Sequence, residues 1–358
     1  MTWKKVNIVT DNGETVDAVA PEIISASRST DIPAFYLDWF MNRIKKGYSI
    51  WTNPFNNQKQ YVSYEKCKFI VFWSKNPIKL IEYADFLKER DIKIYIQYTL
   101  NDYVSEDLEP NVPPVDERIE NFKKLVEVFG KGSVIWRFDP LILVNELLPV
   151  DLLKKIEYIG DKLHGYTDKL VFSFADISTY PKVERNLKQY NVNYREWDYN
   201  TMDIFARELA RLNGFDGCNW NYTLATCSEK IDLKKYGIKH NRCIDDELIT
   251  RIAYKDNELM NFLGMRIHTY GINLFDEYDV VPEGAIWLNS KQYAVRSKMN
   301  IDSGQRQLCG CISSKDIGEY NTCIHQCKYC YANTSNDVAM KNYHKHLENS
   351  NSENITGQ

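Results

Sequence analysis

The sequence predicts an α/β fold, a (β/α) barrel or partial barrel, and two patterns along the chain support this prediction. Compact apolar runs rich in Val, Ile, Phe and Tyr alternate with amphipathic helix patterns, which is typical of a parallel sheet covered by helices. Polar residues follow these runs where the strands would end, and in a parallel barrel all such ends meet at one rim. An open doubly wound sheet is the competing fold, but no glycine-rich dinucleotide fingerprint follows any of the runs.

The barrel is assigned to residues 23–254, after an N-terminal β extension over residues 1–22. Several of its predicted helices begin with Pro or with an acidic first turn, as helix N-termini prefer. The predicted strands are Ile23–Ser27, Tyr48–Thr52, Phe69–Ser74, Lys93–Thr99, Val134–Phe138, Leu170–Ala175 and Asn221–Thr226. The predicted helices between them are Pro33–Lys46, Pro77–Arg90, Val115–Phe129, Val150–Leu163 and Thr201–Leu212.

Three further segments follow the barrel. Residues 255–305 are expected to form a β-containing insertion or cap, because the β-like runs Met265–Tyr270 and Ala285–Leu288 are separated by Gly and Pro. Residues 306–334 carry a cluster of cysteines and are expected to complete the barrel. Residues 335–358 contain one short helix pattern, and we expect the polar tail behind it to be loosely held.

Composition and charge exclude several classes of protein. The 358-residue chain has a net charge of −4 spread along its length, so no broad field attracts nucleic acid, although a local basic groove is not excluded. No apolar run approaches the roughly 18–20 residues that span a bilayer, and Met1–Ala20 lacks the apolar core of a signal peptide. We therefore expect a cytoplasmic protein without a membrane partner. Its nine cysteines then indicate metal binding or catalysis rather than disulfides.

Cys323, Cys327 and Cys330 form the most informative motif in the chain. Gaps of three and two residues let one loop place three thiolates around one [4Fe–4S] cluster. A cluster held in this way keeps one iron without a protein ligand. That iron could bind a substrate or cofactor and pass an electron to it.

The Cys-x3-Cys-x-aromatic-Cys pattern, with Tyr329 as the aromatic residue, resembles the cluster loop of radical S-adenosylmethionine (SAM) enzymes. The resemblance implies that the open iron chelates SAM and that reductive cleavage yields a 5′-deoxyadenosyl radical, which abstracts hydrogen from a substrate. It also implies an electron donor such as flavodoxin or ferredoxin. The cofactor carries this chemistry, while the protein supplies orientation and excludes solvent. The substrate is not indicated.

A resemblance to an uncharacterised bacterial family covers more of the chain. That family is catalogued as a domain of unknown function and is sometimes grouped with spore photoproduct lyase relatives. The segments that carry the resemblance, besides the cysteine stretch, are Ile24–Tyr36, Val71–Pro77, Asn111–Pro114 and Trp136–Pro140.

The position of the cysteine loop departs from the radical SAM pattern, in which the loop follows the first barrel strand. An apparent circular permutation reconciles the two: Cys311–Ile317 supplies that strand, and the Ile23–Ser27 strand takes second place. In radical SAM enzymes the second strand holds the amino group of SAM. Ser25, Ser27 and Arg28 would replace the usual glycine-rich segment there and, with Tyr329, would bind the cofactor.

A second set of cysteines comprises Cys227, Cys243, Cys309 and Cys311. Four thiolates would fully coordinate a second Fe–S cluster or a tetrahedral zinc ion, and ordinary buried thiols are the competing interpretation.

Arg137, Asp139 and Asp176 lie at predicted strand ends and are candidate catalytic residues. Arg137 and Asp139 share one side of their strand, so Arg137 could clamp a carboxylate and Asp139 could hold ribose hydroxyls. The structural alternatives are an internal salt bridge between these two and a capping role for Asp176. His325, inside the cysteine loop, is expected to be exposed.

The sequence thus predicts a radical SAM enzyme with an unidentified substrate. The alternative is that the protein is not an enzyme but a binding module stabilised by zinc or an Fe–S cluster, with nucleic acid as one candidate partner. A cluster used for electron transfer alone is a third interpretation, but the spacings of two-cluster ferredoxins are absent.

Overall fold

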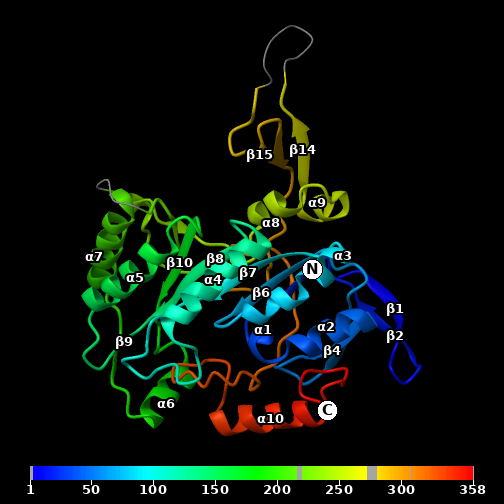
Figure 1. Cartoon of the computed structure of the whole chain (residues 1–358), viewed down its shortest axis with the longest axis horizontal. Coiled ribbons are helices and arrows are strands. Elements are labelled where there is room, and N and C mark those ends of the chain that lie inside the picture. The colour runs from blue at the N-terminus through cyan, green and yellow to red at the C-terminus, as the bar shows by residue number, and fades with distance from the viewer. Residues whose placement is uncertain (1–2, 216–219, 272–279, 307, 358) are drawn as a thin grey trace.

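The structure is a computed structural model that describes residues 3–215, 220–271, 280–306 and 308–357. An eight-stranded sheet forms its centre, with the strand order β17-β3-β6-β7-β8-β10-β12-β13, and all neighbouring strands are parallel (Figure 1). The order of the strands across the sheet is the same as their order in the sequence, except that β17, which comes last in the sequence, lies beside β3. The strands are β3 (Ile23–Ala26), β6 (Phe69–Ser74), β7 (Lys93–Thr99), β8 (Val134–Leu141), β10 (Lys169–Phe174), β12 (Thr223–Thr226), β13 (Lys239–His240) and β17 (Lys315–Asp316).

Both faces of the sheet are buried, which explains why its strands are continuous apolar runs. In β6, Ile70 and Phe72 enter the larger hydrophobic core, whereas Phe69 and Val71 enter a second core on the opposite face. The two edge strands of the sheet are β13 and β17. In the described part of the chain these two strands do not pair with each other. The fold is therefore a mixed α/β fold around a large parallel sheet.

Helices cover the two faces of the sheet in separate groups. Helices α4, α5 and α7 pack side by side over the larger core, and α8 packs on β7 in the second core with α9 beside it. The helices are α1 (Ile32–Phe35), α2 (Leu37–Lys46), α3 (Ala84–Glu89), α4 (Val115–Phe129), α5 (Pro149–Leu163), α6 (Pro181–Gln189), α7 (Tyr199–Ala210), α8 (Asp246–Ala253), α9 (Asn257–Leu263) and α10 (Asn336–Glu348).

Most predicted elements are confirmed, some within one or two residues, but Tyr48–Thr52 is not a strand of the parallel sheet. As β4 it pairs antiparallel with β5 (Lys59–Ser63), in a sheet of order β1-β2-β5-β4 with β1 (Lys5–Val9) and β2 (Thr15–Val19). The residues between β4 and β5 are too few for the crossover that parallel neighbours require.

A small antiparallel sheet projects from the body beyond α8 and α9 (Figure 1). It contains β14 (Met265–Thr269), β15 (Ile286–Asn289) and β16 (Gln292–Arg296), which fits the β-containing insertion expected over residues 255–305. Elsewhere, β9 (Leu143–Val144) pairs with β11 (Tyr194–Arg195) at one end of the sheet.

The tail behind α10 packs against the body, contrary to the expectation of a loosely held end. Ile355 is only 1% exposed, and the backbone N–H of Ile50 in β4 donates to the carbonyl of Glu353 at 2.7 Å. The indole N–H of Trp39 in α2 donates to the carbonyl of Ser352 at 2.9 Å. None of the helices in the described ranges has the length and apolarity to cross a membrane.

Candidate functional site

The loop that carries Cys323, Cys327 and Cys330 is anchored to the carboxyl ends of β3 and β6. The hydroxyls of Thr30, which follows β3, and Thr322 are 2.7 Å apart. The Lys75 ammonium, just after β6, donates to the Tyr329 hydroxyl at 3.1 Å. On the far side, Asn186 of α6 donates to the carbonyl of Cys330 at 3.0 Å, and Figure 1 shows this orange segment reaching α6. The loop therefore lies where open α/β sheets and barrels place their ligands.

The three cysteines of this loop are half-buried, and their thiols are close enough to influence one another's pKa. Burial raises the pKa of Cys323 to about 12, and it also raises the pKa values of Cys327 and Cys330. The Lys75 ammonium opposes this rise at Cys327. As free groups these cysteines would be protonated at neutral pH, so a metal that binds them must displace their protons.

His325 is buried inside the loop, not exposed as expected. Its Nε2 is 2.7 Å from the Asp31 carboxylate, and its Nδ1 is 3.1 Å from the carbonyl of Asn111. The same carboxylate caps α1 through the backbone N–H of Ala34 and accepts from the backbone N–H of Lys75. Both ring nitrogens of His325 are thus engaged in fixing the loop, and neither is free to bind iron.

A buried ionic network lies beside Cys327, and its carboxylate was not anticipated from the sequence. Lys75 Nζ donates to Glu109 Oε1 at 2.6 Å, and the Tyr329 hydroxyl also donates to Glu109. Burial alone would raise the pKa of Glu109, but the charges of Lys75 and Arg118 outweigh it and lower the pKa to about 2. The only sequence signal for Glu109 was a charged residue between Leu108 and Pro110. Tyr329, expected to bind the cofactor, has its hydroxyl in this network.

The predicted cofactor-binding residues at the end of β3 differ in how fully they are engaged. Ser25 Oγ donates to the Asp316 carboxylate at 2.8 Å, and Ser27 Oγ accepts from the backbone N–H groups of Ser29 and Thr30. Arg28 stacks 5.3 Å over the Trp73 ring, and its buried Nη2 has no hydrogen-bond partner within the described ranges. Arg28 therefore keeps a donor for a ligand.

The chain must also pass closely beside Ser27. A Cβ built on Gly318 would lie 1.8 Å from Ser27 Oγ, so this position requires glycine. This close approach holds the residues after β17 against the end of β3.

The candidate catalytic residues form two separate arrangements. Arg137 and Asp139 make a short ion pair, so the internal salt bridge considered for them is present, and Ser173 also donates to Asp139. Asp176 is exposed and accepts from the Thr179 hydroxyl at 2.6 Å, as a turn cap would. Nearby, burial raises the pKa of Glu229 to about 7.

The second set of cysteines is brought together from three segments. Cys227 Sγ and Cys243 Sγ are 3.4 Å apart, and side-chain hydrogen bonds with Cys227 and Cys311 hold the pKa of Cys243 far below its ordinary value. A side-chain hydrogen bond with Cys311 lowers the pKa of Cys309 to about 6. As they stand, no three His, Cys, Asp or Glu side chains in the described residues are disposed to hold a metal ion.

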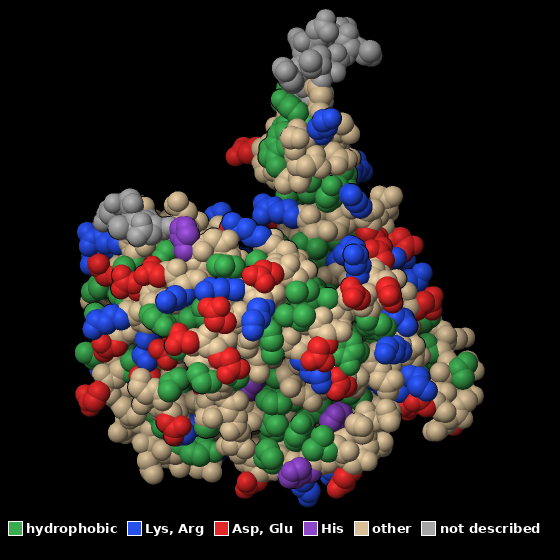
Figure 2. Space-filling model, viewed as in Figure 1, with side chains coloured by type: hydrophobic (Ala, Val, Ile, Leu, Met, Phe, Trp, Pro, Cys, Tyr) green, Lys and Arg blue, Asp and Glu red, His purple; other side chains and the backbone are tan. Residues whose placement is uncertain are grey.

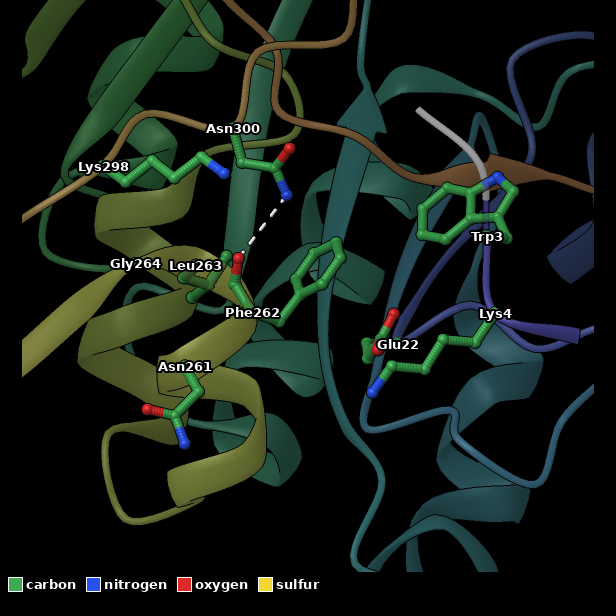
Figure 3. A pocket seen from close by; sticks show the side chains of 9 residues that line it. All are labelled: Trp3, Lys4, Glu22, Asn261, Phe262, Leu263, Gly264, Lys298 and Asn300. Carbon is green, nitrogen blue, oxygen red and sulfur yellow. Dashed lines mark hydrogen bonds between the residues drawn. The ribbon is translucent and has the colours of Figure 1, made fainter.

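A shallow pocket elsewhere on the surface contains none of the predicted site residues. It has a volume of about 240 Å³ and lies between the N-terminal segment and α9, where the Trp3 and Phe262 rings are 6.1 Å apart (Figure 3). Asn300, in the same pocket, donates to the carbonyl of Phe262 at 3.5 Å. We assign it no role.

Comparison with known proteins identifies the family. Residues 23–332 match the family model described as a domain of unknown function, DUF1848. No curated protein and no solved structure matches the chain. Because the family model spans most of the sequence, the chain belongs to the DUF1848 family.

Proposed function

We propose that this protein is a radical SAM-type enzyme with a [4Fe–4S] cluster on Cys323, Cys327 and Cys330. When bound, the cluster would supply the electron that cleaves SAM reductively, and hydrogen would then be abstracted from a substrate still to be identified. The main support is that these three cysteines share one loop anchored at the carboxyl ends of the strands, while both ring nitrogens of His325 are already engaged. This donor set fits a cluster that keeps one iron open to a cofactor.

The topology supports a permuted partial barrel as the scaffold. A doubly wound sheet reverses its strand order at a switch point, whereas this order runs in one direction from β3 to β13 with β17 added beside β3. In the permuted order β17 is the first strand, the cysteine loop and α10 follow it, and β3 becomes the second strand.

The residues around the loop have distinct roles in this proposal. Lys75 offsets the negative charge of the thiolates at Cys327, and the Asp31–His325 pair fixes the loop. Arg28 offers its unpaired guanidinium nitrogen to the carboxylate of SAM. Arg137 and Asp139 would face the substrate or the ribose from the neighbouring strand β8.

The alternative, a zinc- or cluster-stabilised module without catalysis, has less support. On the face shown in Figure 2, Lys and Arg side chains alternate with Asp and Glu, so the described residues of this face form no continuous basic surface for nucleic acid. The cysteine loop is also anchored at the strand ends, where a catalytic centre would be expected.

Anaerobic reconstitution with iron and sulfide, followed by electron paramagnetic resonance of the reduced protein with and without SAM, tests the proposal. We expect a [4Fe–4S] signal that changes when SAM is added, and SAM cleavage after reduction. The Cys327→Ser variant should lose the signal, while Cys67→Ser, which alters a buried cysteine of the hydrophobic core, should retain it. A cluster whose spectrum is indifferent to SAM would favour the non-catalytic alternative.

A further inference from the structure

Four cysteines that lie far apart in the sequence meet in the second hydrophobic core, beside Arg28, which follows β3, and Arg137 of β8. Cys227 follows β12, Cys243 precedes α8, and Cys309 and Cys311 precede β17. Cys227 Sγ contacts Cys243 Sγ at 3.4 Å, the backbone N–H of Cys243 donates to Cys311 Sγ at 3.2 Å, and Cys309 lies two residues before Cys311. All four cysteines belong to or pack against the second hydrophobic core.

Hydrogen-bond donors surround these sulfurs. The backbone N–H groups of Cys243 and Ile244 point at Cys311 Sγ, at 3.2 and 3.4 Å. Asn241 Nδ2 and Arg137 Nη1 each lie 3.1 Å from Cys243 Sγ. Donors aimed at sulfur stabilise the thiolate form, and such outer-shell donors are typical of metal-bound cysteines.

Arginine side chains provide the positive charge that a set of buried thiolates needs. The Arg137 side chain is only 3% exposed and contacts both Cys243 and Asp139. Burial lowers the pKa of Arg28, but the charges of Asp316 and then of the cysteines raise it more. A tetrathiolate with a divalent ion carries two net negative charges, and Arg137 and Arg28 lie beside it, although each is also paired with a carboxylate, Asp139 and Asp316.

The distance between Cys227 Sγ and Cys243 Sγ fits two cysteines on one metal ion better than two cysteines of a cubane. Four sulfurs bound tetrahedrally at about 2.3 Å from one zinc ion lie about 3.8 Å from each other. The observed 3.4 Å between Cys227 and Cys243 is slightly shorter, and because no three His, Cys, Asp or Glu side chains in the described residues are disposed to hold an ion as they stand, zinc binding requires these side chains to turn. In a cubane each cysteine binds a different iron, so the sulfurs would have to move much farther apart.

We propose that Cys227, Cys243, Cys309 and Cys311 bind one zinc ion tetrahedrally. The ion ties residues 309–311 to the end of β12 and to the segment before α8. It therefore fixes the part of the chain that leads into β17 and the cysteine loop. The zinc site shares Arg28 and Arg137 with the SAM chemistry proposed above, but its zinc content can be measured without that chemistry.

The test uses the Cys323→Ser/Cys327→Ser/Cys330→Ser variant, so that the loop cannot contribute metal. Elemental analysis of this protein, purified from cells grown with zinc, should give one zinc ion per chain without acid-labile sulfide. Adding Cys243→Ser should remove the zinc, and adding Cys67→Ser should not.

A second measurement covers the case in which the Cys243→Ser variant does not fold. Removing zinc from the triple variant with a chelator and adding Co²⁺ should give the intense visible bands of tetrahedral cobalt thiolate. Iron with equimolar sulfide in the triple variant, a Cys227–Cys243 disulfide found by mass spectrometry, or the absence of metal would each overturn the zinc site. None of these results depends on whether the loop binds SAM.

Discussion

Replacing Glu109 by Gln removes the carboxylate that balances two buried cations. Lys75 Nζ lies 2.6 Å from Glu109 Oε1, Arg118 Nη1 lies 3.9 Å from Oε2, and the Glu109 side chain is 4% exposed. In Glu109→Gln both cations stay buried without their counter-charge. Removing one partner of a buried pair typically destabilises a protein by about 3–5 kcal/mol.

The pKa of Glu109 gives a second measure of the same interaction. Its pKa falls from the ordinary 4.5 to about 2 on folding. At about 1.4 kcal/mol per pKa unit, this fall stabilises the folded state by about 3 kcal/mol. Because the folded-state pKa is the lower one, the contribution is complete above about pH 4.5 and is lost as the pH falls towards 2.

Urea unfolding of the chain before reconstitution, followed by Trp fluorescence, measures this difference. At pH 7 we expect the free energy of unfolding of Glu109→Gln to be about 3 kcal/mol below that of the wild type. The difference should shrink as the pH falls below about 4.5. The matched control is Glu120→Gln, which removes an exposed partner of Lys123 and should cost less than about 0.5 kcal/mol. A loss below 1 kcal/mol at pH 7, or a difference that does not change with pH, would refute the reasoning.

Further substitutions test the surroundings of the loop. Gly318→Ala forces a methyl group against Ser27 and should destabilise the protein by about 1–3 kcal/mol. This loss should appear as a lower melting temperature, and an unchanged melting temperature would contradict the close approach. Asp31→Asn should lower the iron bound per chain after reconstitution, because it weakens the contact that fixes His325. Arg28→Ala should raise the SAM concentration needed for half of the change in the electron paramagnetic resonance spectrum by about tenfold or more. If the variant and the wild type need the same SAM concentration, Arg28 does not bind the SAM carboxylate.

The strands of the sheet could be predicted closely because each is buried on both faces. Phe69–Ser74 and Lys93–Thr99 are found with the bounds that their apolar runs indicated. Tyr48–Thr52 has the same local pattern, yet it belongs to another sheet, because its partner β5 follows after a short turn. A run of apolar residues therefore predicts a strand but not the sheet that it joins.

The site was predictable only in part. The Cys323–Cys330 spacing lies within one loop, so the sequence itself brings those thiols near each other. Burial of His325 depends on Asp31, which lies 294 residues away, and no local pattern signals that contact. The meeting of Cys227 with Cys243 and Cys311 likewise depends on the order of the strands, and the sequence could offer these cysteines only as candidates.

The pairing of β17 with β3 has a consequence for biosynthesis. Ser25 and its partner Asp316 are 291 residues apart, so β3 remains an unpaired edge while most of the chain leaves the ribosome. An exposed edge invites pairing with other chains until it is covered. A nascent chain that stops before β17 would have neither a protected edge nor the cysteines of the loop. Completion of translation, and not early folding, would then decide when the edge of β3 is covered and when the proposed cluster ligands are present.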